Sequence, residues 1–441
     1  MPANQDFIPE TKINRDLLRP VIETTGRFYL TVAILGLVVL NGLVAFMYQM
    51  ATGMGVAGLN RPVFWGLYIT NFVFWVGISH AGTLLSAILR ITNAQWRRPM
   101  TRAAEALTVF ALMIAGLFPL VHLGRTWTFY FLIPYPSQRG IWPNFRSPLL
   151  WDAIAIFTYY VGSILFLYIS MVPDLGLARD RVGGWRKEIY RVLSLGWRGT
   201  AREWHRVKRA GTIMAMLIVP VFVSVHTIVS WDFGMTLVPG WHSTIFGPYF
   251  VIGAILSGVA AVITLMIILR WALGLKEYLT LTQFDNLGKI LGAVSLAWFY
   301  FFFAEFLTIW YGQVPEEMAV IRHRTFGQYA LAFWVVLFCN FLIPLPALIF
   351  KRVRTSIPAM LVLTIVINVG MFLERYLIIV PSLARQRFPA AWGSYFPSWV
   401  EISIMAGAFC GFALMYVIFA KIFPIIPIWE VKEGQHIQRS T

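Results

Sequence analysis

Long apolar segments alternate with short polar ones along the whole chain. A helix that crosses a bilayer core needs about 20 consecutive, predominantly apolar residues. Ten segments meet this requirement, and Pro or Gly brackets several of them, as at Pro62, Pro148 and Pro381. They lie near residues 28–51, 62–90, 104–133, 148–172, 209–231, 244–272, 287–311, 327–350, 356–380 and 399–423. The pattern predicts an all-α integral membrane protein with ten transmembrane helices.

The order of the spans suggests a division into two units. Spans two to five and spans six to nine can each form a four-helix bundle, with a flanking helix on each side. The predicted units are an N-terminal segment with the first helix, a first bundle, a second bundle, and a last helix with its tail. Their ranges are 1–61, 62–231, 232–380 and 381–441. The polar residues before the first span, and the lack of a small-residue cleavage site after it, argue against a signal peptide.

The composition agrees with a polytopic membrane protein. Of the 441 residues, 58% are hydrophobic and 13% are charged, about half the charged share of a soluble domain. The net charge of +16 reflects an asymmetry between the two sides of the membrane. The termini and the loops on their side carry 27 of the 36 Lys and Arg residues, and the opposite loops carry 7. This bias predicts that both termini are cytoplasmic.

Two kinds of loop have a recognisable character. The loop 173–208 contains a mixed basic and apolar run at 185–199, which suits a helix at the cytoplasmic membrane interface or a solvated connector. The outside loops are rich in Trp, Tyr, Pro and Gly, which is typical of loops that pack on a partner or cover a site. These loops are 134–147, 231–243, 312–326 and 381–398.

The cysteine count limits the redox chemistry of this chain. The two cysteines, Cys339 and Cys410, lie in apolar spans, and the chain contains no CxxC or CxxCH motif. It can neither ligate an iron–sulfur cluster alone nor attach a c-type haem. If the protein takes part in redox chemistry, we expect the metal centres to lie in partner subunits.

Ionisable residues inside the spans are informative, because a charge at the bilayer centre costs about 2.5–3.5 kcal/mol on insertion scales. One group is predicted near the outer side, on consecutive segments: His122, Arg125, Asp152, His226, Asp232 and His242. A His and an Asp at matched depth suit a quinol site, since oxidation releases two protons that imidazole can accept and a carboxylate can relay. Trp127, Tyr130 and Tyr159 are candidates to line the apolar slot for the quinone ring.

Each of these residues also has a simpler interpretation. Asp152 could interact with the dipole at a helix start, Arg125 could reach to the membrane interface, and His226 could bond to a neighbouring helix. A b-type haem would need paired histidines at equal depth on different spans. Only His122 and His226 come close to that arrangement.

A second group of ionisable residues is more scattered along the spans. Its members are His80, Glu105, Glu305, Glu374 and Arg375. Such residues can relay protons through a membrane protein. They can equally form structural pairs, as Glu374 beside Arg375 would suggest.

Several longer motifs resemble a known family. WVGISHAGTLLSAIL (75–89) and RAAEALTVFALMIAGLFPLVHLGR (102–125) are similar to the NrfD/PsrC-type membrane subunits of quinone oxidoreductases. The likeness narrows to the ActC-type, quinol-binding subunits of bacterial alternative complex III. The motifs that carry this narrower likeness are YPSQRGIWPNFRSPLLWD (135–152), VPDLGLARDR (172–181), LGWRGTAREWHR (195–206) and SVHTIVSWDFGMTLVPGWHSTIFGPYF (224–250). The resemblance covers roughly residues 12–425 and agrees with ten spans, whereas smaller polysulfide-reductase relatives have eight.

The resemblance implies a function and a set of partners. It implies a subunit of the bacterial cytoplasmic membrane, in a respiratory or photosynthetic chain, that binds menaquinol in the outer half of the first bundle. His122 and Asp152 match the family's quinol-site residues. Electrons would pass to an iron–sulfur subunit and then to a multihaem cytochrome c subunit, with no metal or haem in this chain. Proton translocation is proposed for the family, and a paralogous membrane subunit (ActF-type) shares the fold.

Two other functions compete with quinol oxidation. A non-catalytic membrane anchor, a role open to the paralogous subunit, predicts that the outer His and Asp tolerate substitution. A proton-coupled transporter acting alone predicts a stable monomer with transport activity, against which the aromatic outer loops argue.

Overall fold

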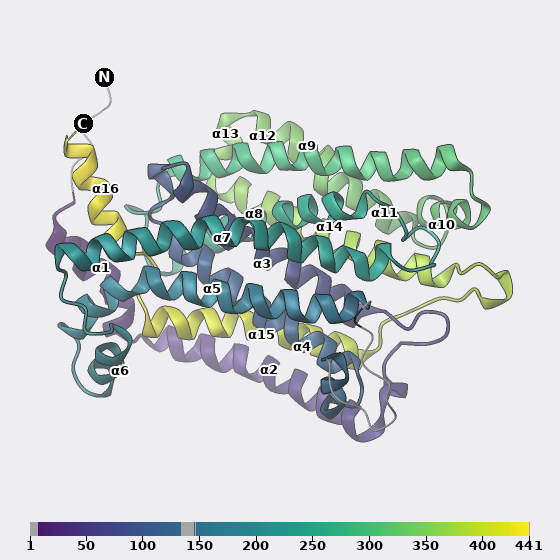
Figure 1. Ribbon diagram of the computed structural model, residues 1–441, viewed down its shortest axis with the longest axis horizontal. Coiled ribbons are helices and arrows are strands. Elements are labelled where there is room, and N and C mark those ends of the chain that lie inside the picture. The colour runs from purple at the N-terminus through teal and green to yellow at the C-terminus, as the bar shows by residue number, and fades with distance from the viewer. Residues whose placement is uncertain (1–7, 134–144, 146, 441) are drawn as a thin grey trace.

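The computed structural model describes residues 8–440 except 134–144 and 146, and the described residues form helices and loops without a strand. Ten helical segments are long and apolar enough to cross a membrane, which confirms the predicted all-α fold with ten transmembrane helices (Figure 1). They are α2 (Gly26–Thr52), α3 (Leu67–Ile91), α4 (Thr101–His122), α5 (Pro148–Arg179), α7 (Ala201–Gly234), α8 (Phe246–Ala272), α9 (Leu281–Gly312), the segment Ala330–Ile349, α14 (Ile357–Ala384) and α15 (Trp399–Ile422).

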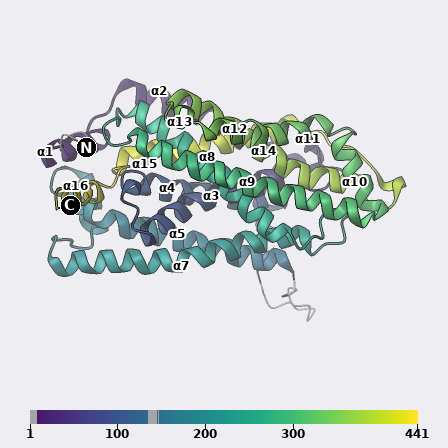
Figure 2. The ribbon, with the colours of Figure 1, turned by 90° about the horizontal axis from the view of Figure 1, so that it is seen from above.

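The bundle has two ends that carry different short elements (Figures 1 and 2). The terminal end carries α1 (Glu10–Ile22), α6 (Trp185–Leu193) and α16 (Ile428–Ser440), together with η2 (Gln95–Arg97) and α13 (Lys351–Arg354). The distal end carries η1 (Met54–Val56), η3 (Thr126–Leu132), α10 (Pro315–Thr325) and η5 (Pro389–Ala391). Which side of a membrane each end faces stays a prediction.

Helix α3 is the centre of the bundle. Almost all of its residues are buried, and it packs against α4, α7, α8 and α14. A Cβ atom at Gly82 would lie 2.0 Å from the carbonyl oxygen of Ala104, so glycine at this position lets α3 and α4 approach closely. Helices α4, α5 and α7 lie around one side of α3, while α8 and α14 connect it to α9.

The two flanking helices differ from the expected arrangement. The sequence suggested one flanking helix on each side, but α2 and α15 pack against each other, next to α4. Gly42 and Gly407 face each other at their crossing, where a Cβ atom on Gly42 would lie 3.0 Å from the Cα of Gly407. Two small residues at one crossing allow close backbone contact, which explains why the first and last spans meet.

Two predicted spans are interrupted. The span expected at 104–133 ends as an α-helix at His122, since Gly124 adopts a positive φ of +67° and a 3₁₀ segment follows. The span expected at 327–350 consists of α11 (Ala330–Leu337), a π turn η4 (Phe338–Leu342) and α12 (Pro344–Ile349). Pro344 has no N–H group for the helix ladder, which accounts for the break.

Candidate functional site

Two acidic residues lie together near the distal end. Asp152 is in the first turns of α5 and Asp232 is near the end of α7, and these helices pack against each other. The neighbouring rings of Trp151 and Trp231 are in edge contact, with centroids 6.1 Å apart. Both carboxylates are more than nine-tenths buried, and they interact electrostatically with each other. The structure therefore brings together two carboxylates from different spans.

The distal end also holds buried polar atoms without a partner. Asp152 Oδ1, Asp232 Oδ1 and His122 Nδ1 are buried and make no hydrogen bond to any residue that the structure describes. His122 is the last residue of α4, which packs on α5. Within the described residues, no hydrogen bond or ion pair joins His122 to Asp152. An unsatisfied buried polar group costs about 1–3 kcal/mol unless a ligand or water supplies a partner.

A second cluster lies deeper in the bundle. It brings His80 of the second predicted group together with Tyr159 and His226 of the first. The ring of Tyr159 is stacked on that of His80, with centroids 4.9 Å apart, and the ring of His226 lies 4.5 Å from His80. All three side chains are fully buried. Tyr159 follows Asp152 by seven residues and His226 precedes Asp232 by six, so the cluster is about 10 Å from the acidic pair along the helices.

Other predicted site residues lie on the surface. Arg125 and His242 are exposed, as are Trp127 and Tyr130, whose exposed fractions are 63% and 47%. The buried neighbour of His242 is Trp241, which donates a hydrogen bond to the carbonyl oxygen of Ile378. The acidic pair therefore does not share a buried environment with these four side chains.

Glu105 belongs to a polar chain in the terminal half of the first bundle. Its carboxylate is fully buried and accepts hydrogen bonds from Ser86 at 2.5 Å and from Ser170 at 3.0 Å. Further along α4, Thr108 bonds to the carbonyl oxygen of Ser79, at 2.5 Å. The residue after Ser79 is His80, whose Nε2 atom has no hydrogen-bond partner among the residues that the structure describes.

A third polar cluster lies in the second group of helices. Glu374 accepts a hydrogen bond from the indole of Trp298 at 2.9 Å and lies 3.3 Å from Arg375. Glu305 lies 3.5 Å from Arg324 of α10. The guanidinium of Arg375 lies over the ring of Phe250, 4.7 Å from its centroid, and that ring is 6.0 Å from the ring of His226.

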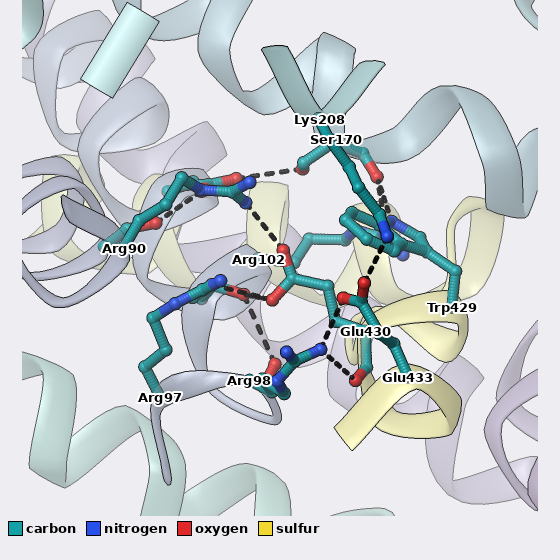
Figure 3. Close-up of polar contacts among 12 residues, drawn as sticks. Arg90, Arg97, Arg98, Arg102, Ser170, Lys208, Trp429, Glu430 and Glu433 are labelled. Atoms are coloured by element: carbon teal, nitrogen blue, oxygen red, sulfur yellow. Dashed lines mark hydrogen bonds and ion pairs between the residues drawn. The ribbon is translucent and has the colours of Figure 1, made fainter. Parts of the chain in front are cut away.

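The sequence did not reveal an ion network at the terminal end (Figure 3). Glu430 of α16 lies between Arg90 and Arg97, at 2.6 and 2.8 Å. Glu433 pairs with Arg98 at 2.6 Å and with Lys208. The partners are more than two hundred residues apart in the sequence, although the alternation of Glu and apolar residues in 428–433 could have indicated a packed helix.

Asp174 attaches the same helix to α5. Its carboxylate accepts the backbone N–H groups of Ile428 and Trp429, at 2.8 and 3.1 Å. It also forms an ion pair of 2.7 Å with Arg102. Asp174 therefore caps the N-terminus of α16 from another helix.

His323 at the distal end and Glu433 at the terminal end lie outside the membrane-spanning segments and have shifted pKa values. Burial and, to a lesser extent, the charges of Arg385 and Arg324 together lower the pKa of His323 in α10 to about 4. Burial alone would raise the pKa of Glu433, but the hydrogen bonds from Lys208 and Arg98 outweigh it and lower the pKa. The two ends therefore differ in how they respond to acid.

A metal centre was not expected in this chain. The two cysteines lie in different elements, Cys339 in η4 and Cys410 in α15. Among the described residues, no group of three His, Cys, Asp or Glu side chains is arranged to hold a metal ion.

The sequence matches a known family and several known membrane subunits. Residues 55–386 match the polysulphide reductase NrfD family. A relative from Halobacterium salinarum, named as a dimethyl sulfoxide reductase membrane subunit, is 28% identical over 62% of this chain and 59% of its own length. A selenate reductase subunit from Mesobacillus selenatarsenatis is 22% identical over 93% of this chain and 96% of its own length. The menaquinone reductase integral membrane subunit of Nitratidesulfovibrio vulgaris is 23% identical over 88% of this chain and 89% of its own length.

Proposed function

The chain belongs to the polysulphide reductase NrfD family, and on this premise we propose that it binds and oxidises menaquinol at its distal end. It would do so as the membrane subunit of a quinol oxidoreductase that resembles alternative complex III. The relative from Nitratidesulfovibrio vulgaris, named for menaquinone reduction, aligns over nearly its whole length and supports a quinone as the substrate.

The observation that carries the proposal is the set of unsatisfied polar atoms near the distal end. Asp152 Oδ1, Asp232 Oδ1 and His122 Nδ1 are buried and have no hydrogen-bond partner in the described part of the chain. A quinol carries two hydroxyl groups, each of which can donate a hydrogen bond to such an atom. Binding the hydroxyl groups there would remove the cost of leaving these atoms unpaired.

The chemistry requires acceptors for two protons and two electrons. Menaquinol loses two protons and two electrons when it becomes menaquinone. A neutral His122 can take one hydroxyl proton, and Asp152 with Asp232 can orient the other hydroxyl group and pass its proton on. Both electrons leave for a partner subunit, since no metal centre is proposed for this chain.

We place the electron-accepting partner at the distal end. This end exposes large aromatic side chains in several loops, among them Trp127, Phe388, Phe396 and Trp399, with exposed fractions of 60% or more. Aromatic residues are enriched in the cores of protein interfaces. The proposed partners are an iron–sulfur subunit, a multihaem cytochrome c subunit and a paralogous membrane subunit.

The proposed orientation places the terminal end in the cytoplasm of a bacterium and the distal end in the periplasm. The terminal side carries 27 of the 36 Lys and Arg residues, as the positive-inside rule predicts for the cytoplasmic side. Quinol oxidation at the distal end would then release its protons outside the inner membrane.

Proton movement through the bundle is a second part of the proposal. The first bundle offers Glu105, Ser86, Ser170 and the His80–His226 pair, and the second offers Glu305 and Glu374 with their arginines. Buried ionisable residues of this kind are commonly functional in membrane proteins. The close approach of Arg375, Phe250 and His226 supports a connection between the two sets.

The direct test is substitution of the distal residues in the intact complex. Asp152→Asn, Asp232→Asn and His122→Ala should each reduce menaquinol oxidation, while assembly, judged by co-purification of the partner subunits, stays unchanged. Asp180→Asn is the matched control, because Asp180 directly follows α5 and is an exposed partner of Arg179. Normal turnover in all three distal variants would contradict the site and favour a non-catalytic anchor.

The proton relay has its own test. In sealed vesicles, Glu105→Gln should lower the number of protons moved per electron pair more than it lowers the oxidation rate. Ser163→Ala, which removes a buried hydroxyl group without a charge, is the control. An unchanged proton ratio in the Glu105, Glu305 and Glu374 variants would exclude these residues as the relay.

A further inference from the structure

Helix α6 presents an apolar stripe outside the bundle. Trp185, Ile189 and Val192 follow one another at intervals of four and three residues, and their exposed fractions are 63%, 38% and 67%. Leu195, just beyond the end of α6, is also exposed, at 74%. On the opposite face, Tyr190 is fully buried. The helix is therefore amphipathic, with its larger apolar side chains facing away from the protein.

The contacts of α6 place it level with the ends of the membrane-spanning helices. Tyr190 donates a hydrogen bond of 2.5 Å to the carbonyl oxygen of Ile422, the last residue of α15. Tyr168 of α5 donates one of 2.7 Å to the carbonyl oxygen of Leu193. Tyr168 lies 20 residues after Pro148, about 30 Å along the helix, which matches the thickness of a bilayer core. The helix thus lies where hydrocarbon gives way to lipid headgroups.

Three cations in and next to α6 form no ion pair with a carboxylate in the described part of the chain. The segment 179–191 contains five Arg and Lys residues and two carboxylates. The carboxylates are taken, since Asp180 pairs with Arg179 and Glu188 pairs with Arg191. Among the described residues, Arg181, Arg186 and Lys187 form no ion pair. The surface next to the stripe therefore has an excess of positive charge.

Two of these cations line a pocket at the start of α6. The pocket has a volume of about 350 Å³ and is bordered by Arg181, Arg186, Trp185 and Ile22. Arg186 donates one hydrogen bond of 2.6 Å to the carbonyl oxygen of Val21 and lies over the ring of Trp185. Arg181 donates one of 3.2 Å to the carbonyl oxygen of Leu177. Each guanidinium keeps further N–H groups that can bind an anion.

We propose that this pocket binds the phosphate of an anionic phospholipid while the stripe of α6 lies in the acyl-chain region beside it. Arginine N–H groups suit phosphate oxygens, and an amphipathic helix with a basic edge binds an anionic membrane surface. The occupant is a lipid rather than a peptide, because the stripe continues the lipid-facing surface at the level where the spans end. The site is separate from the quinol site at the distal end.

Lipid binding is tested on the purified full chain. Native mass spectrometry in detergent with added phosphatidylglycerol or phosphatidylcholine should show preferential binding of phosphatidylglycerol. Arg181→Gln with Arg186→Gln should weaken that binding by about 30-fold, the effect of two basic residues at an anionic surface. Arg191→Gln is the matched control, because Arg191 already pairs with Glu188. Equal binding by the double variant, or full displacement of the lipid by inorganic phosphate, would overturn the proposal.

The position of the stripe is tested independently. A spin label at Val192→Cys, in a Cys339→Ala, Cys410→Ala background and in phosphatidylglycerol vesicles, should be more accessible to oxygen than to a water-soluble nickel chelate. A label at Lys187→Cys should show the reverse. If the label at 192 is accessible to the chelate and becomes protected only when partner subunits are added, a protein covers the stripe and the lipid proposal is wrong.

Discussion

At the terminal end, Glu430 lies 2.6 and 2.8 Å from Arg90 and Arg97, whereas near the distal end Asp152 and Asp232 interact with each other without an ion pair to any described residue. Both sites are buried. At the terminal end the charge of Glu430 is paired with two arginines. Near the distal end one oxygen atom of each aspartate has no hydrogen-bond partner among the described residues. Buried polar groups that the fold satisfies stabilise one structure, and those that it leaves unsatisfied are available to a ligand.

The largest expected effect is the loss of activity on neutralising the acidic pair. Asp152→Asn combined with Asp232→Asn should lower menaquinol turnover by about 10² or more, the usual contribution of a positioned acid or base. The thermal midpoint of the purified complex should not fall, because no ion pair is lost. A drop in the midpoint without a specific loss of turnover would show that the pair is structural like Glu430.

The next effect is on stability at the terminal end. Glu430→Ala leaves Arg90 and Arg97 buried without a counter-charge, which should cost about 3–5 kcal/mol. Thermal unfolding in detergent measures the change, with the exposed Glu188→Ala as the control. If Glu430→Ala unfolds at the wild-type temperature, the ion network does not stabilise the fold. The terminal end would then not differ from the distal end in having buried charges that stabilise the protein.

A smaller effect is expected from the indole of Trp429. Its Nε1 donates a hydrogen bond of 3.0 Å to the carbonyl oxygen of Ser170, which also accepts one from Arg102. Trp429→Phe should therefore cost only about 1 kcal/mol, the net value of one hydrogen bond, because the carbonyl group keeps a partner. A cost as large as that of Glu430→Ala would mean that the packing of α16 matters more than its charges.

At neutral pH the smallest effect is that of His323, because it develops only on acidification. His323 has a folded-state pKa of about 4, below its ordinary value of about 6.5. The unfolded chain therefore binds a proton first, and stability falls as the pH drops from about 6.5 to about 4. His323→Asn should weaken the dependence of the thermal midpoint on pH between about pH 6.5 and pH 4. Glu433→Gln should not, because the lowered pKa of Glu433 keeps its pairs intact until a lower pH.

The sequence predicted the features that depend on the length of apolar segments and on the depth of a residue along a membrane-spanning helix. Apolar runs identified all ten spans, and the rise of a helix placed Asp152 and Asp232 at the same end. It could not give the rotation of each helix about its axis. For this reason the sequence predicts one apolar slot lined by Trp127, Tyr130 and Tyr159, whereas the structure exposes the first two and buries Tyr159 against His80.

Contacts between segments that are far apart in the sequence could not be predicted from it either. Glu430 and its partners Arg90 and Arg97 are more than 330 residues apart, and nothing local to α3 indicates that a helix from the tail will cover it. Proline and glycine gave useful local information, yet the interruption at Pro344 was missed because the flanking residues are uniformly apolar. The quinol site itself stays a prediction, drawn from residue type and depth.

The capping of α16 by Asp174 has a consequence for biosynthesis. A ribosome makes Arg90, Arg97, Arg102 and Asp174 long before it makes residues 428–433. Until residues 428–433 emerge, Arg90 and Arg97 lack Glu430, and Asp174 lacks the two backbone N–H groups whose hydrogen bonds it accepts. Residues 428–433 therefore complete a network whose other members are synthesised much earlier. A variant that lacks these residues should be degraded by quality-control proteases, because Arg90, Arg97 and Asp174 then keep buried polar groups without these partners.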